Sequence, residues 1–512
     1  MNRSPLNRLT APGSLSVVGP LATCLLAIAC GNAPPAETPT PTPSAPPPSA
    51  TDEAPPALVN RTKLPEPAPA PEWGPPEVTE LPLSNGAKLW YLKQGKTPLV
   101  SVQLVLPNGA SSDPPGKEGL TQITTDMLDE GAGKFDALAL SEELQRLATD
   151  YGGRAATDSV DLGMSLLASN FDASMKILAD IVMHPKFGYK DFSRRKGQLI
   201  SQAIADEKDT GTGRINVTRS VLFGKGYGSY SPTGDRVSLK RIGLNDVKQH
   251  HKALFAPQGA TFIVVGGIEI EAVKKGLEEA FKDWQGEPTV KPRPLEAEPT
   301  SGGVHFVDYP GATQSALAIA VRAESNDTKV YFQSEVYNWV LGGAFTSRLN
   351  LNLREDKGYT YGARSTFVRW NQSGFLWLAA KVKSETTRAS IDEMLKEVAA
   401  PCASRPLTQK ERDEAVNGML LGFPGQFESV SGTAMQLAEA RWEGHGPDWF
   451  TTYFTNLDKV SLGGAEAVAK RYCDPKRFVV VVAGDLAKVE PTLKGLDREV
   501  VTYDALGNPK AK

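Results

Sequence analysis

The sequence predicts an α+β fold of two homologous domains, each an antiparallel-rich sheet packed with helices. Strand-like alternation and helical periodicity are interleaved along the chain from Val78 onward. Two segments also share one pattern, HHKALFAPQGATFIVVGG near residue 250 and AKRYCDPKRFVVVVAGD near residue 470. Each runs from a helix end through a proline to a β-branched strand and a glycine. Gly267 and Gly484 are 217 residues apart (484 − 267), which is a domain-sized period and indicates a duplication.

The N-terminal segment, residues 1–29, has the features of an export signal. It carries Arg3 and Arg8 and then a short apolar run, whereas a membrane-spanning helix needs about 20 apolar residues. Small residues precede Cys30, as in a bacterial lipobox, so we expect Cys30 to be lipidated; a simple cleaved signal is the alternative. Gly31 favours the outer membrane over retention at the inner one. The expected location is therefore the periplasmic side of a membrane, with a lipid anchor.

The next segment, residues 30–76, is dominated by proline, alanine, serine and threonine. Such a composition buries too little apolar surface to order, and repeated proline keeps the chain extended, so we expect a tether. The predicted domains are residues 77–284 and 303–497. A proline-rich linker, 285–302, joins them, and residues 498–512 are expected to form a tail.

Local patterns predict the elements of the first domain. LPLSNGAKLWYL is typical of two strands joined by an Asn85-Gly86 turn, and LVSVQLVLPNG of a third strand. A long helical stretch is expected from Gly119. The further elements expected are a helix at 141–151, a strand at 161–168, and helices at 172–183 and 191–208.

Composition and cysteine usage limit the possible partners and sites. The net charge is −3, with 56 basic and 59 acidic residues, and a nucleic-acid partner would call for a basic face, so none is expected. Cys402 and Cys473 are the cysteines outside the predicted signal and lipobox. A disulfide between them is permitted in an oxidising compartment, and the sequence leaves it open. Neither has a second Cys or His at zinc-ligand spacing.

Two motifs carry a family resemblance: GLTQITTDML, residues 119–128, and LGGAFTSRLNLNLREDKGYTYGARS, residues 341–365. Both resemble motifs of the insulinase/pitrilysin zinc peptidases, and the resemblance covers about residues 78–496 in order. In that family the first motif is an inverted zinc site, H-x-x-E-H, on a helix introduced by Gly-Leu. The resemblance implies two domains that enclose a substrate chamber.

The zinc chemistry of that family is missing from this chain. Histidines at positions i and i+4 share one helix face and can hold zinc, while the glutamate serves as base. Here these positions are Gln122, Thr125 and Asp126, and the family's third ligand, a glutamate, corresponds to Gln202. An amide is a poor zinc ligand, so we expect no metal in this chain. Gln122 and Asp126 are instead expected to form a hydrogen-bonded pair.

The substrate-holding residues of the family are retained. An arginine and a tyrosine seven residues apart hold the substrate's carbonyl or backbone in the family, and they match Arg354 and Tyr361. A guanidinium fork and a phenol O–H suit a carbonyl that becomes an oxyanion. The resemblance also implies an edge strand on which an extended peptide pairs. Its residues here are Gly152, Gly153, Arg154, Ala155, Ala156 and Thr157.

Three functions are compatible with these residues. The leading hypothesis is a non-catalytic subunit of a heterodimeric zinc peptidase, in which a homologous partner supplies zinc and base and this chain grips extended peptides or unfolded proteins. The second is an inactive peptide-binding or scaffolding protein of the envelope, for which retention of Arg354 and Tyr361 has no explanation. The third, an autonomous hydrolase with relocated groups, lacks a recognisable nucleophile motif.

Overall fold

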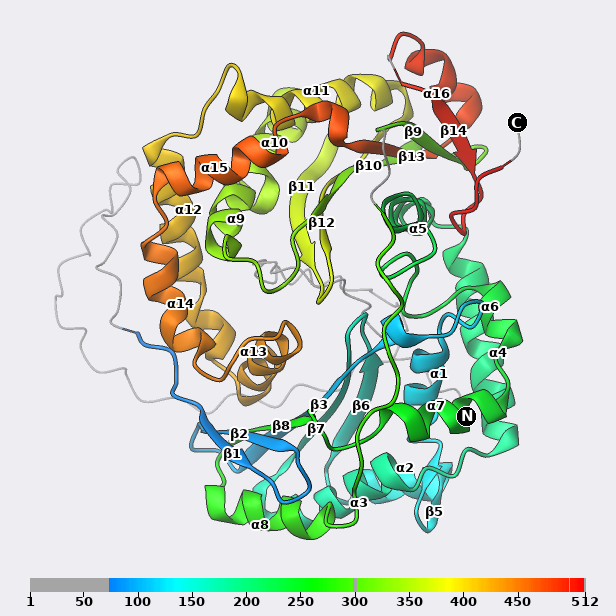
Figure 1. The fold of residues 1–512 in the computed structure, drawn as a ribbon, viewed down its shortest axis with the longest axis vertical. Coiled ribbons are helices and arrows are strands. Elements are labelled where there is room, and N and C mark those ends of the chain that lie inside the picture. Colours follow the sequence, from blue (N-terminus) through cyan, green and yellow to red (C-terminus); the bar gives the residue numbers. More distant parts are fainter. Residues whose placement is uncertain (1–72, 298–301, 497, 511–512) are drawn as a thin grey trace, which may run out of the picture. The chain divides into compact units, whose positions relative to one another are not determined.

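The computed structural model describes residues 73–297, 302–496 and 498–510. The predicted signal, Cys30 and the tether lie outside the described residues. The two halves of the described chain are each built on a six-stranded sheet (Figure 1). The first sheet contains β1 (Thr79–Pro82), β2 (Lys88–Lys93), β3 (Leu99–Pro107), β6 (Asp150–Ala155), β7 (Ser159–Leu167) and β8 (Thr261–Gly266). The second contains β9 (Val304–Asp308), β10 (Gln314–Ala323), β11 (Thr360–Arg369), β12 (Gly374–Lys383), β13 (Val479–Gly484) and β14 (Val500–Tyr503).

Sheet topology shows the predicted duplication. The first sheet has the order β1-β2-β8-β3-β7-β6 and the second β14-β9-β13-β10-β12-β11. In both sheets the second and third strands of this order are parallel, and the third to sixth pair in antiparallel fashion. Because β8 and β13 are equivalent and end at Gly266 and Gly484, the structural period is 218 residues (484 − 266). The halves differ at the outermost strand, where β14, from the expected tail, joins β9 in parallel.

Helices surround both sheets. In the first half they are α1 (Leu120–Asp126), α2 (Ala137–Arg146), α3 (Phe171–Met183), α4 (Tyr189–Asp206), α5 (Thr210–Phe223), α6 (Arg236–Arg241), α7 (Leu244–Leu254) and α8 (Ile270–Ala280). In the second half they are α9 (Tyr331–Asn338), α10 (Arg348–Asn350), α11 (Thr387–Ala399), α12 (Gln409–Gly422), α13 (Val430–Trp442), α14 (Trp449–Asp458), α15 (Leu462–Tyr472) and α16 (Leu486–Leu493). Two π-helical turns, η3 (Trp339–Gly343) and η4 (Leu351–Asp356), flank α10.

Most predicted elements of the first half are present, and the segment after Gly119 differs. The β1–β2 hairpin turns at Gly86, which has the left-handed φ of 90° that glycine adopts readily. The long helix expected from Gly119 stops after seven residues, at Asp126. Positive φ angles at Gly131 and Gly133 then turn the chain into a small ribbon of β4 (Gly131–Ala132) and β5 (Phe135–Asp136). The following helix, α2, consequently ends before Asp150, where β6 begins.

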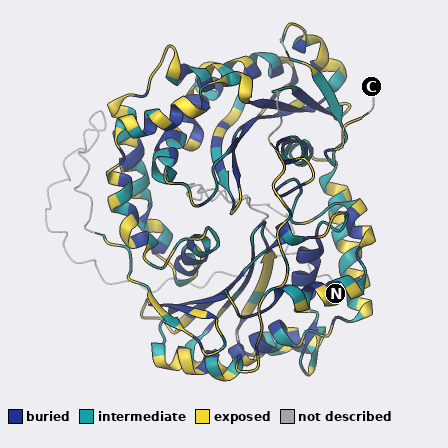
Figure 2. Cartoon of the chain, viewed as in Figure 1, coloured by how far each residue is buried: buried dark blue, intermediate teal, exposed yellow. Residues whose placement is uncertain are grey.

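Each sheet is covered by a helix from the other half of the sequence. α5 belongs to the first half but packs on β13 and β10, where its Val217 lies with Ala318 and Val481 in one buried cluster. α13 belongs to the second half but packs on β3 and β8, and its Leu437 shares a buried cluster with Ile263. Figure 2 shows buried residues along both sheets and on these helices. This reciprocal packing joins the halves through apolar burial.

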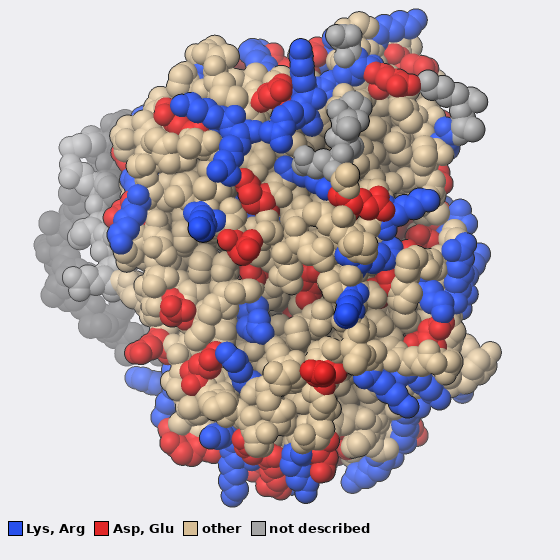
Figure 3. All heavy atoms as spheres, in the orientation of Figure 1, with Lys and Arg blue, Asp and Glu red and all other residues tan. Residues whose placement is uncertain are grey.

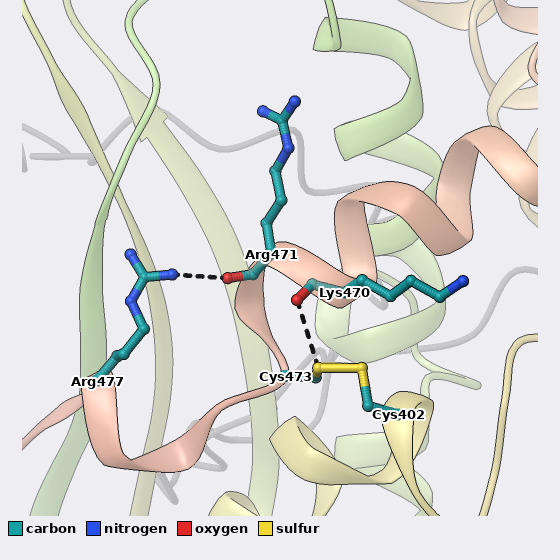
Figure 4. Close-up of a disulfide and its surroundings, with 5 residues drawn as sticks. All are labelled: Cys402, Lys470, Arg471, Cys473 and Arg477. Atoms are coloured by element: carbon teal, nitrogen blue, oxygen red, sulfur yellow. Dashed lines mark hydrogen bonds between the residues drawn. A yellow bond between two sulfur atoms is a disulfide. The ribbon is translucent and has the colours of Figure 1, made fainter.

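A disulfide joins Cys402 to Cys473, which answers the question that the sequence left open (Figure 4). Cys402 ends a short turn after α11, and Cys473 follows α15, 71 residues later. A bond that closes a loop of this length stabilises the folded state by about 2–4 kcal/mol, because it reduces the freedom of the unfolded chain. It also fixes α15 against the α11 end of the second half.

Two features of the described residues concern contacts with other molecules: the length of the apolar helices and the distribution of surface charge. Within residues 73–297, 302–496 and 498–510, no helix is long and apolar enough to cross a bilayer. On the face that Figure 3 presents, lysine and arginine side chains are interspersed with aspartate and glutamate rather than gathered in a basic stripe.

Candidate functional site

The helix that carries the degenerate zinc motif, α1, is fixed at its N-terminus by a glycine and a buried carboxylate. Gly119 has φ +92°, and a Cβ there would lie 2.8 Å from Thr233 O, so this position requires glycine. Asp113 Oδ2 accepts a hydrogen bond from Gly119 N at 2.8 Å, and its Oδ1 accepts one from Thr121 N at 2.8 Å. Burial raises the pKa of Asp113 to about 7. The capping interactions hold the motif's frame although its chemistry has changed.

Gln122 and Asp126 lie on one face of α1 and contact each other, as their i, i+4 spacing predicts. Gln122 Nε2 donates to Asp126 Oδ1 at 2.8 Å. Thr125, which stands where the family motif has its glutamate, donates its hydroxyl to the backbone oxygen of Thr121 at 2.9 Å. The motif positions are therefore occupied by a satisfied hydrogen-bond network.

Arg195 of α4 completes this network, although it lies outside the two sequence motifs. Its NH2 lies 3.0 Å from Asp126 Oδ2, and the Asp126 side chain is only 6% exposed. Gln202, the predicted third position, lies farther along α4, is exposed, and donates to Asp206 Oδ1 at 2.8 Å. The sequence does hold one indication of Arg195. It lies seven residues, or about two helical turns, before Gln202, and so it shares a helix face with the predicted third ligand position.

The predicted edge strand is the outermost strand of the first sheet, β6. A Cβ on Gly152 would meet no atom within 4 Å, whereas one on Gly153 would lie 2.8 Å from Thr125 Cγ2. Gly153 thus allows α1 to approach β6 closely. Ala155 N donates to Gln122 Oε1 at 3.3 Å. One backbone N–H of this edge strand is therefore already bonded to α1.

The open edge is shorter than predicted at its C-terminal end. Ala156 and Thr157 lie beyond β6, and their carbonyls accept hydrogen bonds from Ala110 N at 2.9 Å and Ser111 N at 2.7 Å. A backbone group that already has a partner is not available to a pairing peptide. β6 itself spans Asp150–Ala155, and its Ala155 N is already bonded to Gln122.

Arg154 of this edge links β6 to α13 of the other half. Its NH2 lies 3.1 Å from Asp161 Oδ2, and its guanidinium lies 4.5 Å from the centre of the Trp442 ring. Arg441 of α13 also donates from its Nε to Thr261 Oγ1 at 2.9 Å. The predicted peptide edge thus contacts α13 through the Arg154–Trp442 pair, while the ion pair of Arg154 with Asp161 lies within the first sheet.

Glu439 of α13 makes the contact between β6 and α13 sensitive to pH. Burial raises the pKa of Glu439 to about 7, the charge of Glu443 raises it further, and Arg154 opposes the shift. In the unfolded chain Glu439 loses this proton near the ordinary glutamate pKa of 4.5. The contribution of Glu439 to the stability of the native protein therefore falls as the pH rises from about 4.5 to about 7 and stays low above that range.

We expect Glu439→Gln to remove this part of the pH dependence. The variant should match the native protein near pH 4 and gain about 1–3 kcal/mol over it by about pH 8, because the amide carries no charge to desolvate. Urea unfolding across this range measures the difference. A difference that does not change with pH would contradict the expected titration.

Arg354 and Tyr361 lie at the two ends of a tight loop in the second half. Arg354 is in η4 and Tyr361 in β11, the outermost strand of the second sheet. Gly358 N donates to Arg354 O at 3.2 Å, and Tyr359 N donates to Leu353 O at 2.9 Å. Gly358 has φ +64°, which closes the loop. The loop therefore places both residues at the same end of β11.

The two side chains are presented to solvent. Tyr361 is 92% exposed. Arg354 Nε lies 3.2 Å from Glu355 Oε1, and its guanidinium lies 4.6 Å from the ring centre of Phe345, which is itself exposed. Arg348 is different, because its guanidinium binds Glu411 Oε1 at 2.7 Å and donates to two carbonyls. Arg348 is therefore structural, whereas Arg354 is available to a ligand.

The arginine–tyrosine loop and the degenerate zinc motif occupy equivalent places in the duplicated fold. α1 packs on β6, and α10 with η4 packs on β11. Ala155 N donates to the amide oxygen of Gln122 at 3.3 Å, and Ala363 N donates to that of Asn350 at 3.2 Å. Among the described residues, no hydrogen bond or ion pair of the structure connects Arg354 or Tyr361 with the Gln122–Asp126 pair.

Comparison with known proteins identifies the family. Residues 90–211 match the model of the insulinase family, peptidase family M16, and residues 241–419 match that of the peptidase M16 inactive domain. The chain belongs to peptidase family M16. The resemblance inferred from the two motifs is thereby confirmed.

Individual M16 relatives are distant but cover most of the described chain. A Helicobacter pylori protein called non-peptidase homolog YmxG is 22% identical over 73% of this chain and 86% of its own length. A Bacillus subtilis protein, called uncharacterized zinc protease YmxG, is 18% identical over 68% of this chain and 84% of its own length. A Pseudomonas fluorescens M16 inactive-domain structure, 21% identical, has a TM-score of 0.74 and covers 80% of this chain and 98% of its own. This structure shows the predicted α+β fold.

The residues of this M16 chain do not fit the zinc ion that the family implies. Gln122 presents an amide, Thr125 bonds its own helix, and Asp126 is already paired with the cation of Arg195. Within the part of the chain that the structure describes, no three His, Cys, Asp or Glu side chains are grouped to hold a metal ion. A guanidinium next to Asp126 repels a divalent cation, so no step of a reaction is assigned to zinc in this chain.

Proposed function

We propose that this chain is a non-catalytic subunit of an M16 zinc peptidase complex. Arg354 and Tyr361 hold the carbonyl of an extended peptide, and a homologous subunit with an intact H-x-x-E-H supplies zinc and base. The observation that carries the proposal is the contrast between the two equivalent places in the fold. Arg195 neutralises the former zinc motif, whereas Tyr361 is exposed, Arg354 is half-buried, and the ion pair of Arg354 with Glu355 is made through Nε.

The chemistry of the pair suits a carbonyl oxygen that gains negative charge. A guanidinium offers several N–H donors in a fixed plane, and a phenol offers one O–H. Such donors stabilise an oxyanion most when they are positioned before the reaction. The tight Arg354–Tyr361 loop and the ring of Phe345 provide this positioning. The name of the Helicobacter relative, a non-peptidase homologue, also supports an inactive chain.

Reconstitution with a zinc-bearing M16 subunit tests this proposal. We expect the purified mature chain alone to bind no stoichiometric zinc after dialysis against a weak chelator and to cleave no peptide. The partner alone should be weakly active, and the mixture should cleave extended or unfolded substrates. One zinc per chain in the isolated protein would refute the non-catalytic assignment. A mixture that assembles and gains no activity would favour an inactive peptide-binding scaffold.

We further propose that the chain is exported and anchored by a lipid on Cys30 to the periplasmic side of the outer membrane. The disulfide between Cys402 and Cys473 supports an oxidising compartment, because such bonds persist outside the reducing cytosol. We expect Cys30→Ala to move the protein from the membrane fraction to the soluble fraction. A variant that stays with the membranes would show that another contact anchors it.

A further inference from the structure

The α5 side of strands β11 and β12 carries several basic side chains. Arg364 stands opposite Ala379 in the β11–β12 register, and directly opposite residues share one face of a sheet. Side chains alternate along a strand, so Trp377, Lys381 and Lys383 lie on this same face of β12. Arg364, Lys381 and Lys383 are all exposed.

Arg214 adds a fourth cation and shows that this is the face covered by α5. Its guanidinium lies 4.9 Å from the ring centre of Trp377, and its NH1 donates to Leu317 O at 3.2 Å. Burial, and next the charge of Arg364, lower the pKa of Arg214 to about 10. The positive charge of Arg364 thus disfavours the charged form of Arg214. We call the four cations, Arg214, Arg364, Lys381 and Lys383, the basic face.

The basic face has few compensating carboxylates. Lys381 Nζ lies 3.5 Å from Asp209 Oδ2, which also raises the pKa of Arg214. Within the described residues, no carboxylate lies at ion-pair distance from Arg364 or Lys383. By contrast, Arg369 on the opposite side of β11 is paired with Glu335 at 2.6 Å. Neighbouring cations that lack paired carboxylates attract an anionic group, and they do so most strongly where the protein excludes water.

We propose that the basic face is a subsite for acidic side chains of the peptide that Arg354 and Tyr361 hold. The inference rests on the proposed function and specifies its substrate class. Tyr361 and Arg364 lie three residues apart on β11, and the register with β12 shifts between Thr360 and Ala363, so their Cα atoms are at most about 10 Å apart. An extended peptide whose carbonyl contacts Tyr361 therefore brings an aspartate or glutamate about three residues away to the basic face.

Binding of matched peptides tests the subsite. Two fluorescein-labelled peptides of one length are compared by anisotropy with the mature chain, one with Asp and Glu and the other with Asn and Gln at the same positions. We expect the acidic peptide to bind roughly tenfold more tightly at low salt and to lose this advantage at high salt. Arg364→Gln with Lys381→Gln should remove the preference and leave the affinity for the amide peptide unchanged. Arg364→Glu should favour a lysine-containing peptide.

A matched control removes the same charge elsewhere. Lys274 and Lys275 are exposed on α8, which packs on α3 and β2 away from the second sheet (Figure 1). Lys274→Gln with Lys275→Gln should keep the preference for the acidic peptide. Equal binding of both peptides by the native chain, or a preference that survives at Arg364→Gln with Lys381→Gln, overturns the subsite and leaves the peptide-holding function standing. Failure of the native chain to bind either peptide overturns both.

Discussion

Arg354→Ala and Tyr361→Phe should each lower the turnover of the reconstituted complex by about 100-fold to 1000-fold while the two subunits still assemble. Removing one donor to a developing oxyanion costs about 2.7–4 kcal/mol of transition-state stabilisation. Tyr361 is 92% exposed, so deletion of its hydroxyl removes no packing and leaves the fold intact. The measurement is kcat and KM of the complex, with assembly followed by size-exclusion chromatography.

Neighbouring residues provide the controls for this experiment. Tyr359→Phe deletes a hydroxyl two positions from Tyr361, and Lys357→Ala removes a cation three positions from Arg354 that is paired with Asp356. Both variants should keep nearly normal turnover. If Arg354→Ala and Tyr361→Phe complexes form and cleave at the native rate, the pair is structural, and a peptide-binding scaffold becomes the better account of this chain.

Arg195→Met should cost about 3–5 kcal/mol of stability, because it leaves the carboxylate of Asp126 buried without its cation. The Asp126 side chain is 6% exposed and that of Arg195 17%, so water replaces the lost partner poorly. Gln122 Nε2 still donates to Asp126 but carries no charge. Urea unfolding of the variant and of the native chain measures the loss.

Two further variants decide the cause of that loss. Arg195→Met with Asp126→Leu should recover most of the stability, because an apolar pair replaces a buried ion pair at little net cost. Arg194→Met, at the adjacent residue, breaks an exposed ion pair with Glu130 and should cost less than about 1 kcal/mol. Equal losses at positions 194 and 195, or no recovery in the double variant, would show that the Asp126–Arg195 pair does not fix α1.

Local sequence signals predicted the duplicated strands, the Gly86 hairpin and the motif positions. Each depends on neighbours in the chain: alternation along a strand, a glycine with positive φ, or spacing along one helix. The same reasoning overextended α1, because the positive φ angles of Gly131 and Gly133 turn the chain after Asp126. Residue types alone did not show how strongly those glycines would turn the backbone.

By itself the sequence indicated the family and a duplication with a domain-sized period, because each is a pattern of residue types at fixed spacing; the substrate-holding role of Arg354 and Tyr361 stays a prediction. Only the tertiary structure decided which helix covers which sheet, that Arg195 pairs with Asp126, and that strand β6 ends at Ala155. These features arise between segments far apart in the chain. Helical periodicity gives a helix an apolar face, but the surface that buries this face is selected by packing across the whole molecule.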